Sequence, residues 1–184
     1  MLKQAISQSF TLQPKEEKVI SFSCIVPPQT PVTRGRTRVH LRTGLDISMA
    51  IDPSDWDEIS VKPHPLMEKV LQAVQNLGFH LHEVDCEYNP RLGHPYPFVQ
   101  EFEFRPNGKY YGRLDELEVT LRFDGYQLEV LLQIDRKVRG LQSFIEESFG
   151  LDERYAHLQI PASDADISIG VLMEQIDSLI QSRL

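Results

Sequence analysis

The sequence predicts a mainly β fold in which antiparallel strands form two groups, with one helix between the groups and another at the C-terminus. Two observations predict it. Apolar and polar residues alternate in many short stretches, which is typical of strands that bury one face. Apolar residues also recur at spacings of three and four in residues 66–77 and 167–180, which is typical of amphipathic helices. Prolines and glycines separate these stretches and indicate the element boundaries.

The first strand group is predicted within residues 17–62. Its opening strand, residues 17–26, consists largely of β-branched and aromatic residues in near-alternation. It ends at two prolines, which have no N–H for a sheet ladder. Three further stretches alternate or are rich in β-branched residues, and we expect them to follow as strands: residues 33–42, 45–51 and 58–62.

A helix is predicted to join the two strand groups. Residues 62–65 read Lys-Pro-His-Pro, and prolines favour extended backbone in the residues that precede them. Pro65 itself suits the first turn of a helix. The apolar spacing then runs to Leu77, and Asn76 and Gly78 indicate where the helix ends.

The second strand group is predicted to begin after Gly78, with strands over residues 79–87 and 98–105. A hairpin follows, because residues 117–123 and 128–134 alternate on either side of Asp124-Gly125. An Asp-Gly pair between alternating strands favours a type I′ turn, which needs positive φ at both central positions.

Three more elements are expected before the chain ends. Residues 141–149 predict a short helix that ends at Gly150, and Leu158 with Ile160 predicts a brief last strand. The C-terminal amphipathic helix is expected to begin near residue 164, with Ser163 or Asp164 as its cap.

The composition limits the functions that the chain can have. Its net charge is −8 over 184 residues, which argues against a general affinity for nucleic acid or for an anionic membrane. No apolar run approaches the roughly 18 residues that span a bilayer, and the first ten residues lack the apolar core of a signal peptide. The two cysteines, Cys24 and Cys86, are far apart, so we expect a reducing, cytoplasmic location.

Two stretches of the chain resemble a known family. The first reads Thr-Pro-Val-Thr-Arg-Gly-Arg-Thr-Arg-Val-His-Leu-Arg-Thr-Gly-Leu-Asp over residues 30–46 and continues through Ala-Ile-Asp-Pro to the Pro-His-Pro at residues 63–65. The second includes Glu-Val-Asp-Cys-Glu, Pro-Phe-Val-Gln-Glu-Phe-Glu-Phe, Gly-Arg-Leu-Asp-Glu-Leu-Glu-Val, Ile-Asp-Arg, Arg-Gly-Leu and Gly-Leu-Asp-Glu, between residues 83 and 153. In the order and spacing of these motifs the chain resembles the SpoOM family of sporulation-control proteins.

The resemblance implies a fold and a role. The fold would be two arrestin-like antiparallel β-sandwich lobes: the later strands of a first lobe in residues 1–62, a second lobe in residues 63–162 and a C-terminal helix in residues 163–184. The role would be that of a regulatory protein in the control of sporulation or stress-related development, which binds other proteins and has neither catalytic residues nor a cofactor.

The resemblance also implies an unpaired edge. Family members carry several more strands before the point where this chain begins. A half-complete sandwich exposes unpaired backbone and an uncovered apolar face, which promotes pairing with another chain. We therefore expect a possible homodimer, formed by edge pairing or strand exchange.

A row of arginines is the first candidate binding site. On a strand, side chains at even spacing share one face, and guanidinium groups in a row suit carboxylate or phosphate recognition. The expected partner is an acidic or phosphorylated protein segment. The alternative is that these side chains form ion pairs with acidic residues of neighbouring strands, such as Glu58 or Asp46. The arginines are Arg34, Arg36, Arg38 and Arg42.

Paired acids and histidines give an alternative function, a metal-dependent or glycan-directed enzyme or binding module. Two glutamate pairs alternate with apolar residues, and four carboxylates would converge if their strands are neighbours. A glycosidase uses two carboxyl groups about 5 Å apart, and hard cations prefer oxygen ligands. Two histidines on one strand face would offer two zinc ligands, but the sequence identifies no third. The alternative reading of the acids is a solvated sheet face. The residues are Glu101, Glu103, Glu116, Glu118, His80 and His82.

Asp135 and Arg136 close the second strand of the predicted hairpin. Alternation places one of the two side chains inward, and a buried charge needs a partner. We interpret the pair as a structural lock that holds the helix expected at residues 141–149, and not as an active site.

Overall fold

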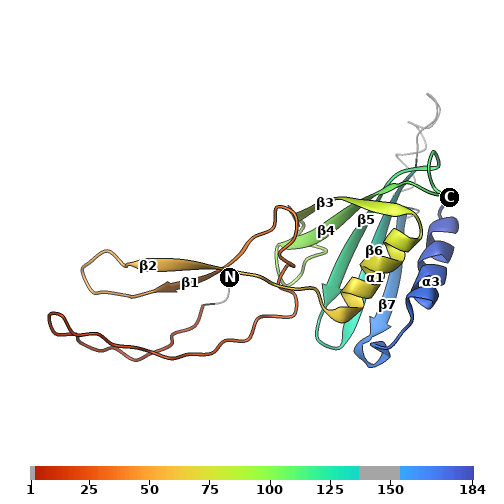
Figure 1. The fold of residues 1–184 in the computed structure, drawn as a ribbon. Helices are drawn as coiled ribbons and strands as arrows, with labels where there is room; N and C mark the ends of the chain where they lie inside the picture. Colours follow the sequence, from red (N-terminus) through yellow and green to blue (C-terminus); the bar gives the residue numbers. More distant parts are fainter. Residues whose placement is uncertain (1–2, 137–153) are drawn as a thin grey trace.

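The computed structural model describes residues 3–136 and 154–184, in which two antiparallel sheets and two α-helices form (Figure 1). The mainly β fold class, with a connecting helix and a C-terminal helix, is confirmed. In chain order the elements are β1 (Val39–Gly44), β2 (Ser54–Ile59), α1 (Pro65–Asn76), β3 (Phe79–Tyr88), β4 (Phe98–Pro106), β5 (Leu114–Phe123), β6 (Gln127–Arg136), β7 (Tyr155–Pro161), the 3-10 helix η2 (Ala162–Asp164) and α3 (Ile169–Gln181).

The larger sheet is an antiparallel meander in the order β3-β4-β5-β6-β7. Alternation along each strand gives it one apolar and one polar face. The helices α1 and α3 pack against each other and cover the apolar face (Figure 1). The centre of the core is formed by Phe102, Phe104, Leu117, Val119 and Leu132 of the sheet together with Leu66, Val70, Leu172 and Ile176 of the helices.

The helix α1 begins and ends where the prolines and glycine predict. His64 is its N-cap and accepts a hydrogen bond from the Leu66 amide at Nδ1, 3.3 Å away. Pro65 occupies the first turn. After the helix, Gly78 has φ +92°, and its Cα lies against Gly108, so a side chain there would meet backbone at 3.1 Å.

The cap predicted for the C-terminal helix is wrong. Residues 162–164 form η2, and α3 begins later, with Ser168 as the N-cap that accepts from the Val171 amide. The buried hydroxyl of Tyr110 fixes the helix from the sheet side, because it hydrogen-bonds Asp177 Oδ1 at 2.7 Å. The predicted division at residues 62 and 162 stays a prediction.

The hairpin of β5 and β6 is confirmed, but its turn differs from the predicted type I′. Asp124 donates its N–H to the Gln127 carbonyl, so the central residues are Gly125 and Tyr126. Only Gly125 has positive φ, +99°. A glycine at the first central position is the requirement of a type II′ turn. The Asp124 carboxylate accepts from the amides of Tyr126 and Gln127 at 2.8 Å, which explains why aspartate precedes the glycine.

The strands β1 and β2 form a separate two-stranded ribbon that projects from the body (Figure 1). The strand predicted for residues 45–51 is wrong, because these residues belong to the loop that reverses the chain between β1 and β2. Met49 has φ +61°, and the Leu45 amide bonds the Pro53 carbonyl across the loop. The strand predicted at residues 58–62 lies further back, at Ser54–Ile59, because it pairs with β1 in that register.

Residues 17–26 form no strand, contrary to the prediction. They run in extended conformation beside the ribbon (Figure 1), and none of their backbone groups makes a backbone hydrogen bond within the residues described. Strand-forming side chains without a neighbouring strand give an extended segment but no sheet.

The strand predicted over residues 33–42 begins only at Val39, because residues 32–37 are anchored to the body in another conformation. The Gln100 amide group accepts from the Val32 N–H and donates to the Val32 carbonyl, both at 2.8 Å. Gln100 also donates to Thr37 Oγ1 at 3.1 Å. Gly35, at φ +60°, lies so close to the Val84 carbonyl that a side chain would meet it at 2.5 Å. We call these residues, 32–37, the anchor segment.

Two further expectations concern the helices. The short helix expected at residues 141–149 lies outside the described residues. No helix within residues 3–136 and 154–184 is long and apolar enough to cross a membrane.

Candidate functional site

The polar face of the five-stranded sheet gathers carboxylates from four strands. The strand register places Glu83, Glu103 and Glu118 in one row across β3, β4 and β5. It places Asp85 opposite Glu101 in the next row. The predicted convergence of the four glutamates on one face is therefore confirmed by the pairing. We call this surface the acidic face, and it comprises Glu83, Asp85, Glu101, Glu103, Glu116, Glu118 and Asp135.

Like charges directly opposite each other destabilise a sheet, so the acidic face needs partners or protons. Arg105 pairs with Glu103 at 3.2 Å. Arg36 of the anchor segment pairs with both Glu83 and Asp85 at the outer edge of β3. These arginines lie at the β3–β4 side, while Arg154 lies 3.9 Å from Asp135 of β6.

The pKa values on this face respond to that arrangement. Burial, and after it the surrounding carboxylates Glu101 and Asp135, together raise the pKa of Glu118 to about 7. Burial and the neighbouring Glu103 also raise the pKa of Glu116. At neutral pH Glu118 is therefore partly protonated, whereas an isolated glutamate would have lost its proton.

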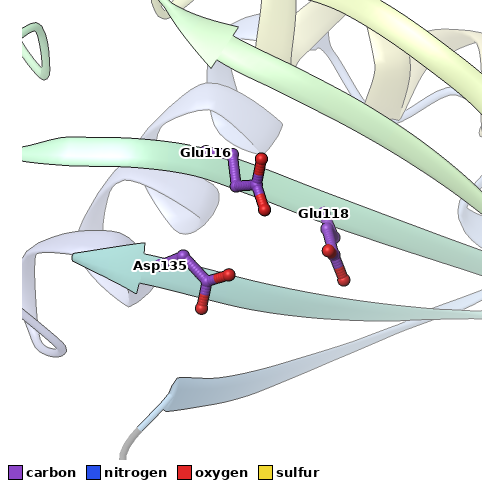
Figure 2. A group of neighbouring side chains, drawn as sticks. All are labelled: Glu116, Glu118 and Asp135. Atoms are coloured by element: carbon purple, nitrogen blue, oxygen red, sulfur yellow. The ribbon is translucent and has the colours of Figure 1, made fainter. Parts of the chain in front are cut away.

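Three of these side chains lie close enough to share one ligand. The ligand oxygens of Glu116, Glu118 and Asp135 all lie within 4.8 Å of one another, and Figure 2 shows the three carboxylates on the same side of β5 and β6. Asp135 Oδ1 is shielded from solvent and accepts no hydrogen bond among the described residues, although Arg154 lies 3.9 Å away. Sequence reasoning found the glutamates but did not add Asp135, because the β5–β6 register brings it there.

The predicted arginine row does not lie on one strand face. Only Arg42 belongs to β1, because the turn at Gly35 separates Arg34 and Arg36 from the strand. Arg36 pairs with carboxylates of the acidic face. Arg38 lies 3.6 Å from Glu58, the partner named in the alternative interpretation. The structure thus brings two of the four arginines into ion pairs within the chain.

Arg42 instead forms part of an aromatic cluster on the ribbon. Its guanidinium lies 5.2 Å from the ring centre of Trp56, which is its cross-strand partner. The His40 ring contacts the same indole edge-on, with centroids 5.9 Å apart. Trp56 remains 55% exposed. We call His40, Arg42 and Trp56 the ribbon patch.

The other predicted residues are dispersed. His80 and His82 are exposed on β3, and His82 lies 3.9 Å from Glu103. The possible metal-ligand cluster found in the described part of the chain does not include either histidine. Of the predicted lock, Asp135 lies near Arg154, whereas the side chain of Arg136 lies outside the description. The lock therefore stays a prediction.

Two important residues were missed in the sequence. Gln100 lies two residues before Phe102 and four before Phe104, so alternation places this amide on the apolar face. A polar residue at a core position signals a buried hydrogen-bond partner, and that signal was available. Trp56 lies between two aspartates in a stretch that resembles a turn, so no local pattern indicated its exposure on a strand.

We predict that Glu118→Gln stabilises the protein above neutral pH. The folded pKa is about 7 and the unfolded value about 4.3, so folding favours the protonated acid. That stability is fully present below about pH 4 and is lost as pH rises through 7. Glutamine imitates the protonated form. Because Glu118 is only half-buried, we expect a gain of about 1 kcal/mol at pH 8 and almost none at pH 4.

Urea unfolding at the two pH values measures this difference. Glu174→Gln is the matched control, because Glu174 is exposed on α3, away from the acidic face. Equal effects of Glu118→Gln at pH 4 and pH 8 would contradict the account of the acidic face.

Comparisons with known proteins place the chain in a family. The profile of the SpoOM protein family matches residues 1–138. The sporulation-control protein Spo0M of Bacillus subtilis is 43% identical over 162 residues, which are 88% of this chain and 63% of that protein. The crystal structure of Spo0M from Bacillus subtilis superposes with a TM-score of 0.71 and 36% sequence identity, over 85% of this chain and 64% of that one.

The chain thus spans less than two thirds of the length of the relative that it matches. The matched residues nevertheless include the anchor segment, the ribbon patch and the whole acidic face. The profile and the 43% identity together show that this chain belongs to the SpoOM protein family.

Proposed function

We propose that this protein acts in the cytoplasm in the control of sporulation or of stress-related development, and that it does so by binding other proteins and not by catalysis. The similarity to the sporulation-control protein of Bacillus subtilis supports the regulatory role. The binding mode is inferred from the surface of this chain.

The observation that carries the proposal is the ribbon patch. Tryptophan and arginine are the residues most enriched where a few contacts dominate protein–protein binding. Here Trp56 is half-exposed on a projecting ribbon, with Arg42 stacked over its ring and His40 at its edge. The stacking holds the guanidinium in place, which lowers the entropy lost when it binds a carboxylate or phosphate. An acidic or phosphorylated protein segment is therefore the partner that fits.

The remaining arginines of the predicted row extend this surface. The Arg38 guanidinium donates hydrogen bonds to the backbone carbonyls of Gly35 and Thr37 at 3.0 Å. These bonds hold the side chain next to the start of β1. Arg36 is engaged with the acidic face. We therefore propose Arg42 as the principal arginine of the contact, with Arg34 and Arg38 as secondary contributors and Arg36 as the arginine that fixes the anchor segment.

We predict that Trp56→Ala weakens binding of the partner about tenfold or more, because loss of one dominant aromatic contact commonly costs 2 kcal/mol or more. The measurement is quantitative capture by the purified chain from a lysate of sporulating Bacillus subtilis, with discrete bound proteins identified. The same variant should lose any effect of the expressed chain on heat-resistant spore counts in a strain that lacks its own Spo0M.

The matched control is Tyr126→Ala. Tyr126 is 84% exposed at the tip of the β5–β6 hairpin and lies on the body, not on the ribbon. Its removal should change neither binding nor spore counts. If Trp56→Ala and Tyr126→Ala behave alike while both melt at the wild-type temperature, the ribbon patch is not the contact surface.

A second candidate function, binding of a divalent cation, rests on one observation. Glu116, Glu118 and Asp135 offer three oxygens within 4.8 Å, and Asp135 Oδ1 has no hydrogen bond among the described residues. Oxygen ligands of this kind suit Ca²⁺ or Mn²⁺. The glycan-directed alternative has no comparable support, since it rests on the carboxylates alone.

Calorimetric titration of the chain with calcium chloride and manganese chloride tests the cation. A dissociation constant of about 1 mM or tighter, with binding lost in Asp135→Asn, is expected for a site with few protein ligands. Absence of both heat and a shift in melting temperature at millimolar cation would exclude this function.

A further inference from the structure

A pocket of about 280 Å³ lies on the polar face of the larger sheet, at the end where β5 and β6 form their hairpin. The loop between β3 and β4 contributes Arg91 and Leu92 to its lining. We call this cavity the loop pocket. The strand register gives its floor two rows of side chains, which are Arg122, Glu129 and Gln159 in one row and Thr120, Leu131 and His157 in the other.

Hydrogen bonds hold the loop that lines this pocket. The side-chain oxygen of Asn89 accepts from the Leu92 amide at 3.0 Å, and its carbonyl accepts from the Gly93 amide at 2.9 Å. From the sheet, the Arg122 guanidinium donates to the carbonyls of Leu92 and His94, both at 3.1 Å. A pocket whose wall is already ordered loses less entropy when a ligand binds.

The charges around the pocket leave two basic side chains unused. Arg122 Nε donates to Glu129 Oε2 at 2.9 Å, so the charges of these two residues offset each other. The side chains of Arg91 and His157 are exposed in the pocket and make no hydrogen bond or ion pair within residues 3–136 and 154–184. A guanidinium and an imidazole N–H are both suitable donors to the oxygens of an anion.

The neutral lining residues indicate the chemical class of the ligand. The Gln159 amide adds a further donor to those of Arg91 and His157. A phosphate monoester has three terminal acceptor oxygens, one more than a carboxylate, and can engage all three donors. Leu92 and Leu131 offer apolar contacts to the organic part of such a ligand. The volume lies just below the roughly 300–1,000 Å³ of pockets for drug-sized ligands, which favours a small molecule.

The electrostatic surroundings determine which contacts matter. The chain has a net charge of −8, and Glu101 of the acidic face lies opposite Thr120 in the strand register. The general field of the protein therefore does not attract an anion. Binding must depend on direct contacts, and above all on the guanidinium of Arg91.

We propose that the loop pocket binds a small organic phosphate monoester. Arg91 and His157 hold the phosphate group, and Leu92 and Leu131 contact the organic part. The pocket lies on the five-stranded sheet, whereas the ribbon patch lies on β1 and β2. The protein thus has a small-molecule site in addition to the surface proposed for its protein partner.

Titration of the full chain with phenyl phosphate, followed by the amide resonances in NMR at constant ionic strength, tests the site. The expected result is saturable shifts at Arg91, Leu92, His157 and Gln159, with a dissociation constant of about 1 mM. Inorganic phosphate should bind more weakly because it has no organic part, and neutral benzyl alcohol should not shift these resonances. Inorganic phosphate that binds as tightly as phenyl phosphate would contradict the organic ligand.

Arg91→Gln removes the principal cation and should raise the dissociation constant for phenyl phosphate about tenfold, because a charged hydrogen bond is lost. His157→Gln should also weaken binding. Since neither side chain has a bond among the described residues, both variants should melt at the wild-type temperature.

The matched control is Arg113→Gln. Arg113 is an exposed arginine that directly precedes β5, at the opposite end of that strand from the pocket. This variant should bind phenyl phosphate like the wild type. Equal effects of Arg91→Gln and Arg113→Gln, shifts confined to β1 and β2, or no shift at 20 mM phenyl phosphate would overturn the proposal.

Discussion

The attachment of the anchor segment and the ribbon to the five-stranded sheet depends on a single buried side-chain amide. Gln100 lies on the apolar side of β4, and its side chain bonds both backbone groups of Val32 at 2.8 Å. The Gln100 side chain thus makes the two hydrogen bonds to Val32 that a neighbouring strand would otherwise make. An unpaired amide at this position would cost about 1–3 kcal/mol, so the anchor segment is held wherever Gln100 is buried. The position of the ribbon follows from that contact.

The anchor segment also links the two candidate surfaces. It crosses the outer edge of β3, where the Arg36 amide bonds the Val84 carbonyl and the Arg36 side chain meets Glu83 and Asp85. The same segment leads directly into β1, which carries Arg42 of the ribbon patch. Arg36 thus partly neutralises the acidic face, while Arg42 contacts Trp56 on the exposed ribbon.

The body of the fold could be predicted from the sequence because each of its elements has a local pattern that agrees with its final surroundings. The α1 helix and strands β3 to β7 follow from periodicity. Residues 17–26 and 45–51 have the same alternation but form no strand, because a strand needs a partner as well as a propensity. The convergence of the glutamates could be predicted conditionally, but the inclusion of Asp135 needed the register. Gln100 could have been found as a polar residue in a core position.

Amide hydrogen exchange at Val32 tests the dependence on Gln100 most directly. We expect the Val32 amide of the wild type to exchange far more slowly than the exposed amides of residues 19–26 at concentrations where the chain is monomeric. In Gln100→Leu it should exchange rapidly, while the amides of β5 and β6 remain protected. A Val32 amide that is unprotected in the wild type, or equally protected in Gln100→Leu, would contradict the claim that this side chain holds the ribbon on the body.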